Sequence, residues 1–191
     1  MSFDRQRGVT LIELILFILI IGIALAAILG VMNVTTRNSA DPVRTKQALM
    51  IAEGLLEEVQ LTGFTRCDPA ANNADGTCSA AENWGQLDPE TPGPRPYDNV
   101  NDYVNQANTA VAAFNNASGV LVDANGRALN VSGYTATVAI MPEAIGPAGT
   151  QVGTPNGTAA DTDMLRIRIT VFFDNQSLVL DGYRARYAPG G

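Results

Sequence analysis

The residue in the most unusual chemical setting is Glu13, which lies inside the apolar stretch "RGVTLIELILFILIIG" of residues 7–22. An ionisable side chain in a membrane-length apolar segment costs about 2.5–3.5 kcal/mol on insertion scales. A carboxylate in such a place is a functional hypothesis by default, because it can pair with a cation or accept hydrogen bonds.

Two cysteines are the next residues in the sequence whose side chains could form a bond or bind a metal. Cys67 and Cys78 are separated by ten residues in a stretch rich in Gly, Asn, Asp and Ala. This spacing fits neither zinc ligands nor a redox Cys-x-x-Cys. Because a membrane-export signal precedes them, we expect a disulfide that closes a short loop, worth about 2–3 kcal/mol of stability. Two free thiols are the alternative.

The groups that most enzymes need are missing from the sequence. The chain has no histidine, which removes the commonest metal ligand and the usual general base near neutral pH. It has no Gly-x-Ser-x-Gly elbow and no phosphate-binding glycine loop. The fragment "VDANGR" at residues 122–127 is the nearest approach to a calcium loop, and it is better explained as a turn. We therefore expect no enzyme activity, no cofactor and no metal.

The charge balance argues against nucleic acid as a partner. Twelve Lys and Arg stand against nineteen Asp and Glu, a net charge of -7, and Lys46 is the single lysine. Phosphate binding needs clustered cations, and the arginines here are scattered.

The element that positions Glu13 is an apolar helix. Leu14 to Met32 is an uncharged run of nineteen residues, about 28 Å of helix, which is close to the hydrocarbon thickness of a bilayer. Arg5 and Arg7 precede it, so the positive-inside rule keeps the N-terminus in the cytoplasm and predicts that everything after Met32 is translocated.

The stretch "RGVTLIEL" resembles the N-terminal signal of type IV prepilins and pseudopilins. The resemblance implies that a prepilin peptidase/methyltransferase cuts between Gly8 and Val9 and methylates the new amino group of Val9. Glu13 becomes the fifth residue of the mature chain. Other pilin subunits, major and minor, are the implied partners. The protein would lie in the inner membrane before assembly, and afterwards in a periplasmic or extracellular pilus.

Cleavage at Gly8 gives Glu13 a candidate partner. The α-amino group exposed on Val9 is mostly protonated at neutral pH, and it lies about one helical turn from the carboxylate. In a filament of staggered parallel helices, Glu13 can pair with its own amine or with that of a neighbour, and the cost of leaving a buried charge unpaired would enforce axial register. A generic single-pass anchor with an incidental acid is the alternative.

The rest of the chain predicts an α+β architecture, in which a long N-terminal helix packs its C-terminal half on an antiparallel sheet. We divide it into a leader (1–8), an apolar helix (9–33), an amphipathic continuation (34–62) and a head (63–191). Asp41-Pro42 predicts a break of the helix around residues 38–41. The apolar stripe of the continuation consists of Val43, Leu49, Ala52, Leu55, Leu56 and Val59, and its charged residues, including Glu57 and Glu58, are expected on a solvated face.

Three segments with alternating apolar and polar residues predict the sheet. They are "YTATVAIM" (134–141), "MLRIRITVFF" (164–173) and "SLVLDGYRARYA" (177–188), the last two joined as a hairpin by "DNQS". Residues 119–131 add a weaker hairpin or only a loop. Trp84 and Tyr97 are expected to anchor the long loop of residues 67–99 on the core, although exposed aromatic residues can also be binding hot spots.

A narrower resemblance runs from residue 7 to about residue 105. "SADPVRTKQALMIAEGLLEEVQ", the cysteine pair and "PYDNVNDYVN" are similar to the minor pilin D (MshD) family of the mannose-sensitive haemagglutinin (MSHA) pilus. Asn101 replaces one acid of that family's Val-Asp-Asp-Tyr motif, which puts an ionic role there in doubt. A minor pilin is therefore the leading prediction. A type II secretion pseudopilin and a membrane-anchored adhesin that binds through the loops around Trp84 are the alternatives.

Overall fold

The computed structural model describes residues 8–37, 41–68, 79–86 and 93–186. The chain falls into two compact units, Met1–Arg44 and Thr45–Gly191. Each unit is described by itself below.

The first unit contains helix α1 (Leu11–Arg37). Its segment Leu11–Asn33 has a mean hydropathy of 3.2 and is not buried anywhere in the structure. At 1.5 Å per residue this segment is long enough to cross a bilayer, which confirms the predicted apolar helix. Helix α1 ends at Arg37 and helix α2 begins at Asp41. Residues 38–40, where the break is predicted, lie outside the described residues.

Helix α2 (Asp41–Leu61) supplies one wall of the head's core. Its fully or nearly fully buried residues are Ala48, Ala52, Leu55 and Val59. They follow each other at spacings of four and three residues and so lie along one line of the helix. The predicted stripe is wrong at Val43 and Leu49, which are 63% and 38% exposed.

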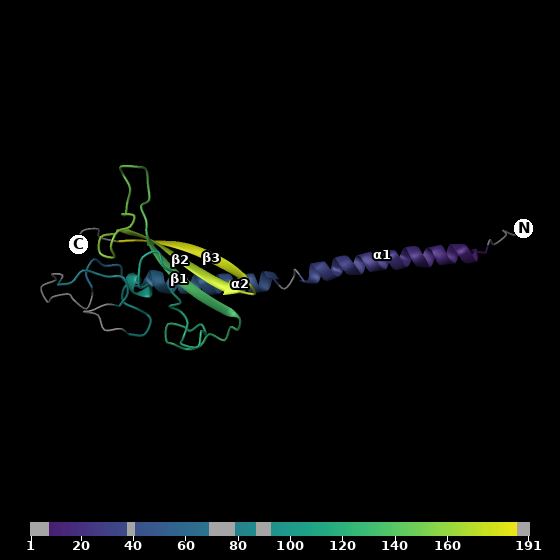
Figure 1. Ribbon diagram of the computed structural model, residues 1–191, viewed down its shortest axis with the longest axis horizontal. Helices are drawn as coiled ribbons and strands as arrows, with labels where there is room; N and C mark the ends of the chain where they lie inside the picture. The colour runs from purple at the N-terminus through teal and green to yellow at the C-terminus, as the bar shows by residue number, and fades with distance from the viewer. Residues whose placement is uncertain (1–7, 38–40, 69–78, 87–92, 187–191) are drawn as a thin grey trace, which may run out of the picture. The chain divides into compact units, whose positions relative to one another are not determined.

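The head's sheet has three antiparallel strands, as predicted, and their order is β1-β2-β3 (Figure 1). The strands are β1 (Tyr134–Pro142), β2 (Met164–Phe173) and β3 (Gln176–Ala185). The hairpin between β2 and β3 turns on Asp174 and Asn175, whose φ angles are 45° and 59°. A two-residue type I′ turn requires positive φ at both positions, and Asp and Asn tolerate it better than most residues do. Strand β3 therefore begins at Gln176, one residue earlier than predicted.

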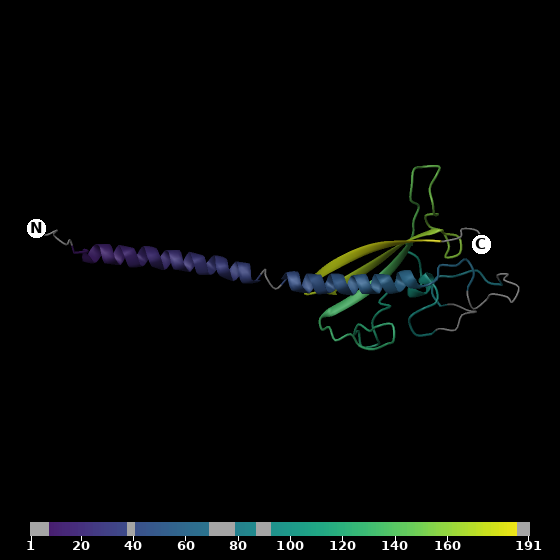
Figure 2. The same ribbon diagram turned by 180° about the vertical axis from the view of Figure 1, so that it is seen from behind.

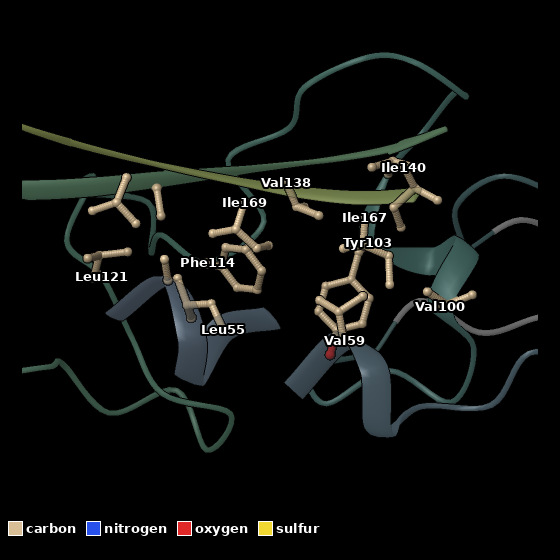
Figure 3. Close-up of a cluster of buried hydrophobic side chains, with 14 of the residues drawn as sticks. Leu55, Val59, Val100, Tyr103, Phe114, Leu121, Val138, Ile140, Ile167 and Ile169 are labelled. Carbon is tan, nitrogen blue, oxygen red and sulfur yellow. The ribbon is translucent and has the colours of Figure 1, made fainter. Parts of the chain in front are cut away.

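One face of the sheet is covered by α2, and the core lies between them (Figures 2 and 3). Every second residue of β2 is buried, which confirms the predicted period of two. Helix and sheet lie close together at Gly182, where an added Cβ would lie 2.6 Å from Gln60 Nε2 and 2.8 Å from Leu56 Cδ1. The core side chains labelled in Figure 3 are Leu55, Val59, Val100, Tyr103, Phe114, Leu121, Val138, Ile140, Ile167 and Ile169.

The loops of the head are attached to this core. Trp84 and Tyr97 are partly buried against it, which confirms their predicted anchoring role. A short 3₁₀ helix, η2 (Val100–Tyr103), is entirely buried. Within the described residues 119–131 there is no strand, only isolated bridges such as Val122 with Ala128. Hydrogen bonds from the Asp123 N–H to the Arg127 carbonyl oxygen and from the Leu129 N–H to that of Leu121 flank this bridge, so the segment forms the weaker of the predicted hairpins.

Candidate functional site

The predicted cleavage point lies outside the helix, directly before α1. Gly8 and Val9 are not helical and both are exposed. Val9 is 71% exposed, and a Cβ added to Gly8 would meet nothing within 4 Å. The Gly8–Val9 bond is therefore exposed and lies outside the helix, as cleavage there would require.

Glu13 is the third residue of α1 and lies in its first turn. The backbone N–H groups of Glu13 and Leu14 both donate to the carbonyl oxygen of Thr10, each at 3.1 Å, which marks Thr10 as the start of the helix. An acidic side chain at this end interacts favourably with the helix dipole. Thr10 and Glu13 also have the Thr-x-x-Glu spacing of a capping box, which the sequence reasoning did not consider.

The predicted cysteine pair lies only partly in the described chain. Cys67 is half-buried and forms an isolated antiparallel bridge with Ala81. Cys78 lies outside the described residues. The bridge brings the segment after Phe64 beside the segment that follows Cys78, a geometry that suits a short closed loop. The Cys67–Cys78 disulfide remains a prediction.

The head contains a buried ion pair that the sequence did not reveal. Arg95 Nε donates to Glu58 Oε1 at 2.8 Å, and Arg95 Nη2 donates to Glu58 Oε2 at 3.1 Å. The two side chains are only 6% and 12% exposed. The prediction of a solvated face is therefore wrong for Glu58, because the loop carrying Arg95 folds over this turn of α2.

The same arginine holds two further loops. It donates to the carbonyl oxygens of Ala113 at 3.2 Å and Val122 at 3.0 Å. Its guanidinium lies 4.9 Å from the ring centre of Phe114. The charge is thus satisfied by one carboxylate, two carbonyl groups and an aromatic face, as a buried cation requires.

Tyr103 completes this cluster. Its hydroxyl donates to Glu58 Oε1 at 3.0 Å, and its ring packs edge-on against Tyr97 with centres 4.7 Å apart. Burial raises the pKa of Tyr103, and the nearby Glu58 carboxylate raises it further. Burial likewise raises the pKa of Tyr97, although Arg95 opposes the shift. Both phenols are therefore held in the neutral, hydrogen-bonding form.

The Val-Asn-Asp-Tyr motif has a structural role within η2. Asp102 Oδ2 accepts a hydrogen bond from the backbone N–H of Asn99 at 3.0 Å. The Asn99 side chain in turn donates to Glu82 Oε2 at 2.9 Å, and both residues are buried. Asn101 is fully buried as well. The motif fixes the path of the chain that delivers Tyr103 to Glu58.

Comparison with known families gives one match. The family model described as the prokaryotic N-terminal methylation motif matches residues 3–29. Comparisons with curated proteins and with solved structures find no match. The matched segment contains Gly8, Val9 and Glu13, and it implies processing by a prepilin peptidase and assembly with other pilin subunits. Together with the apolar helix and the α+β head, this N-terminal match supports a type IV pilin-like protein, of the pilin or pseudopilin type.

Proposed function

We propose that this protein is a minor pilin of an MSHA-type pilus, a structural subunit that primes assembly or displays its head at or near the pilus tip. The observation that carries the proposal is the exposed Gly8–Val9 bond, directly before an apolar helix with Glu13 in its first turn. Processing there would create an amine about one turn from the carboxylate, and the pair would set the register of neighbouring subunits.

The assignment to a minor pilin draws support from the head. The resemblance to the minor pilin D family includes the Leu-Glu-Glu end of α2 and the Val-Asn-Asp-Tyr motif. In the structure these two segments meet through the hydrogen bond from Tyr103 to Glu58. The proposal includes the Cys67–Cys78 disulfide. It also includes an inner-membrane location with the N-terminus in the cytoplasm before assembly, and a place in the pilus afterwards.

We propose a structural rather than a catalytic role, since the sequence offers no site for chemistry. A type II secretion pseudopilin is the second candidate, because the N-terminal features serve pilins and pseudopilins equally. The adhesin hypothesis is weaker because Trp84, its proposed contact residue, packs on the core.

Mass spectrometry of the native N-terminus tests the processing step: a chain that begins at N-methylated Val9 is expected. Shearing of cells, followed by immunoblotting of the sheared and inner-membrane fractions, tests the place in a pilus. Recovery of the protein with the sheared pili supports a pilus subunit. A processed protein that stays wholly in the inner membrane while pili are sheared off would refute it and favour the pseudopilin.

A further inference from the structure

Helix α2 has an exposed side that points away from the sheet (Figure 2). Lys46 and Met50 lie two residues before and two residues after the buried Ala48. Because residues two positions apart are turned by about 200° around a helix, both side chains lie opposite the core. Glu57 follows Met50 by seven residues and shares this side. We call Lys46, Met50, Gly54 and Glu57 the outer face of α2; all four are exposed, Met50 by 71%.

The two charges of the outer face have no partner in the part of the head that the structure describes. Neither Lys46 nor Glu57 forms an ion pair or a side-chain hydrogen bond with a described residue. The two residues are eleven positions apart, which is about 16 Å along the helix axis, so they cannot reach each other within one copy. The face therefore offers a free cation near one end and a free carboxylate near the other.

Between these charges, Gly54 lies beside an apolar groove. A Cβ added to Gly54 would meet nothing within 4 Å, so packing within the head does not explain a glycine in the middle of a helix. The groove has a volume of about 560 Å³ and runs between α2 and the hairpin of residues 119–131. Its apolar lining comes from Met50, Ile51 and Leu55 on one side and from Ala124, Leu129 and Val131 on the other. A long and flexible side chain such as methionine suits a groove of this kind.

We propose that two copies of this chain pack through the outer faces of α2, with the two helices antiparallel. In a pair centred near Ala52, Lys46 of one copy lies beside Glu57 of the other. Met50 of one copy then lies over Gly54 of the other and enters the groove there. Because a two-fold axis relates the copies, each of these contacts is made twice.

The positions of the charges select this arrangement. Parallel helices in register would set Lys46 against Lys46 and Glu57 against Glu57, and like charges at such positions are unfavourable. Parallel helices shifted by seven residues would pair Lys46 with Glu53, but they would form one ion pair instead of two. The antiparallel pair satisfies both charges of both copies.

The contact is small, because it involves one face of one helix from each copy. An interface of this size is weak in dilute solution, but two copies anchored in one membrane have a high effective concentration. The contact requires neither Glu13 nor cleavage after Gly8. This proposal and the proposed function therefore fail separately.

The test exploits Lys46, the single lysine of the chain. A carbodiimide joins an amine to a carboxylate only where the two groups touch. The full chain in detergent micelles, as a mixture of unlabelled and ¹⁵N-labelled copies, should give a peptide in which Lys46 of one copy is joined to Glu57 of the other. Mass spectrometry identifies both the residues and the labels. Glu53→Gln removes another exposed acid of α2 and is the matched control, with an unchanged yield expected.

An exchange of charges tests the geometry. Glu57→Lys sets like charges opposite each other and should lower the yield of covalent dimer about tenfold. Mixing these chains with Lys46→Glu chains creates two pairs of opposite charge, and the yield should return to the wild-type level. A wild type without a link between Lys46 of one copy and Glu57 of another would overturn the proposal. A dominant link from Lys46 to Glu53, or to a carboxylate outside α2, would overturn the antiparallel packing. A mixture that gives no more dimer than Glu57→Lys alone would do the same.

Discussion

Arg95 binds both carboxylate oxygens of Glu58, at 2.8 and 3.1 Å, across a separation of 37 residues in sequence. The contact joins the C-terminal part of α2 to three loops of the head, since the same guanidinium also reaches Ala113 and Val122. A pair of this kind contributes to the unique arrangement of the loops more than to net stability, because desolvation offsets most of the attraction.

Arg95→Leu should destabilise the head by about 3 kcal/mol, because it leaves the buried carboxylate of Glu58 without its cation. Trp84 is the only tryptophan and is partly buried in the head, so its fluorescence during urea unfolding reports on this unit. Arg127→Leu is the control: this arginine is exposed, and we expect a change within about 0.5 kcal/mol. Equal effects of the two substitutions would contradict the role given to Arg95.

Tyr103→Phe should change the response of the head to alkali. The pKa of Tyr103 is raised above the ordinary value of 10.0. Its stabilisation is therefore fully present below pH 10 and is lost as pH rises toward the folded-state pKa, by up to about 1.4 kcal/mol per pH unit. Wild type should lose more stability than Tyr103→Phe between about pH 9 and about pH 11. Parallel pH profiles of the two proteins, measured by urea unfolding, would show that Tyr103 is not the group concerned.

Two glycines should respond in opposite ways to alanine. Gly182→Ala places a methyl group against Leu56 and Gln60, and we expect a loss of about 1–3 kcal/mol from overpacking. Gly54 lies in α2 with nothing within 4 Å of an added Cβ, so Gly54→Ala should stabilise by about 0.5–1 kcal/mol. Thermal unfolding of both variants gives the comparison, and a neutral Gly182→Ala would mean that α2 lies farther from β3 than described.

The cysteines should resist alkylation until a reductant is added. If Cys67 and Cys78 form a disulfide, intact mass before and after reduction shows two newly alkylated thiols. Cys67→Ser should then cost about 2–3 kcal/mol, and the double variant with Cys78→Ser should cost no more. Alkylation of both cysteines in the untreated protein would exclude the bond.

Glu13→Ala should leave membrane insertion intact and reduce incorporation into filaments about tenfold or more, since an unpaired buried charge costs several kcal/mol. Glu13→Gln separates two explanations, because Gln can cap the helix but cannot pair with an amine. If Glu13 acts through its charge, the Gln variant should be as defective as the Ala variant in sheared pilus fractions. Normal incorporation of Glu13→Gln would assign the residue to helix capping instead.

The sequence predicted the regular elements because their patterns are local and uninterrupted. The apolar run gives α1, and strict alternation gives β2 with its buried row from Leu165 to Phe173. The buried face of α2 was predicted less well. Large apolar residues such as Val43 drew the prediction, which included Ala52 but missed the fully buried Ala48.

No sequence pattern of comparable strength predicts the contact between Glu58 and Arg95. Glu58 follows another acid on an amphipathic helix, a pattern typical of a solvated face. Arg95 lies between two prolines in a segment without periodicity. Their meeting depends on the path of the long loop, which the packing of Trp84, Tyr97 and η2 determines only in three dimensions. A sequence pattern cannot express a contact of this kind.

The position of this ion pair along α2 has a mechanical consequence. Any pull transmitted along the backbone from the apolar segment enters the head at the first turn of α2. The helix is held along its length by two alanines and two larger apolar residues, and Glu58 lies one residue before the last of them. Because an intact helix is stiff along its axis, withdrawing it would load the Arg95 bonds in shear together with the packing of these buried residues. The pair would therefore share the tension as a directional contact near the C-terminal end of α2.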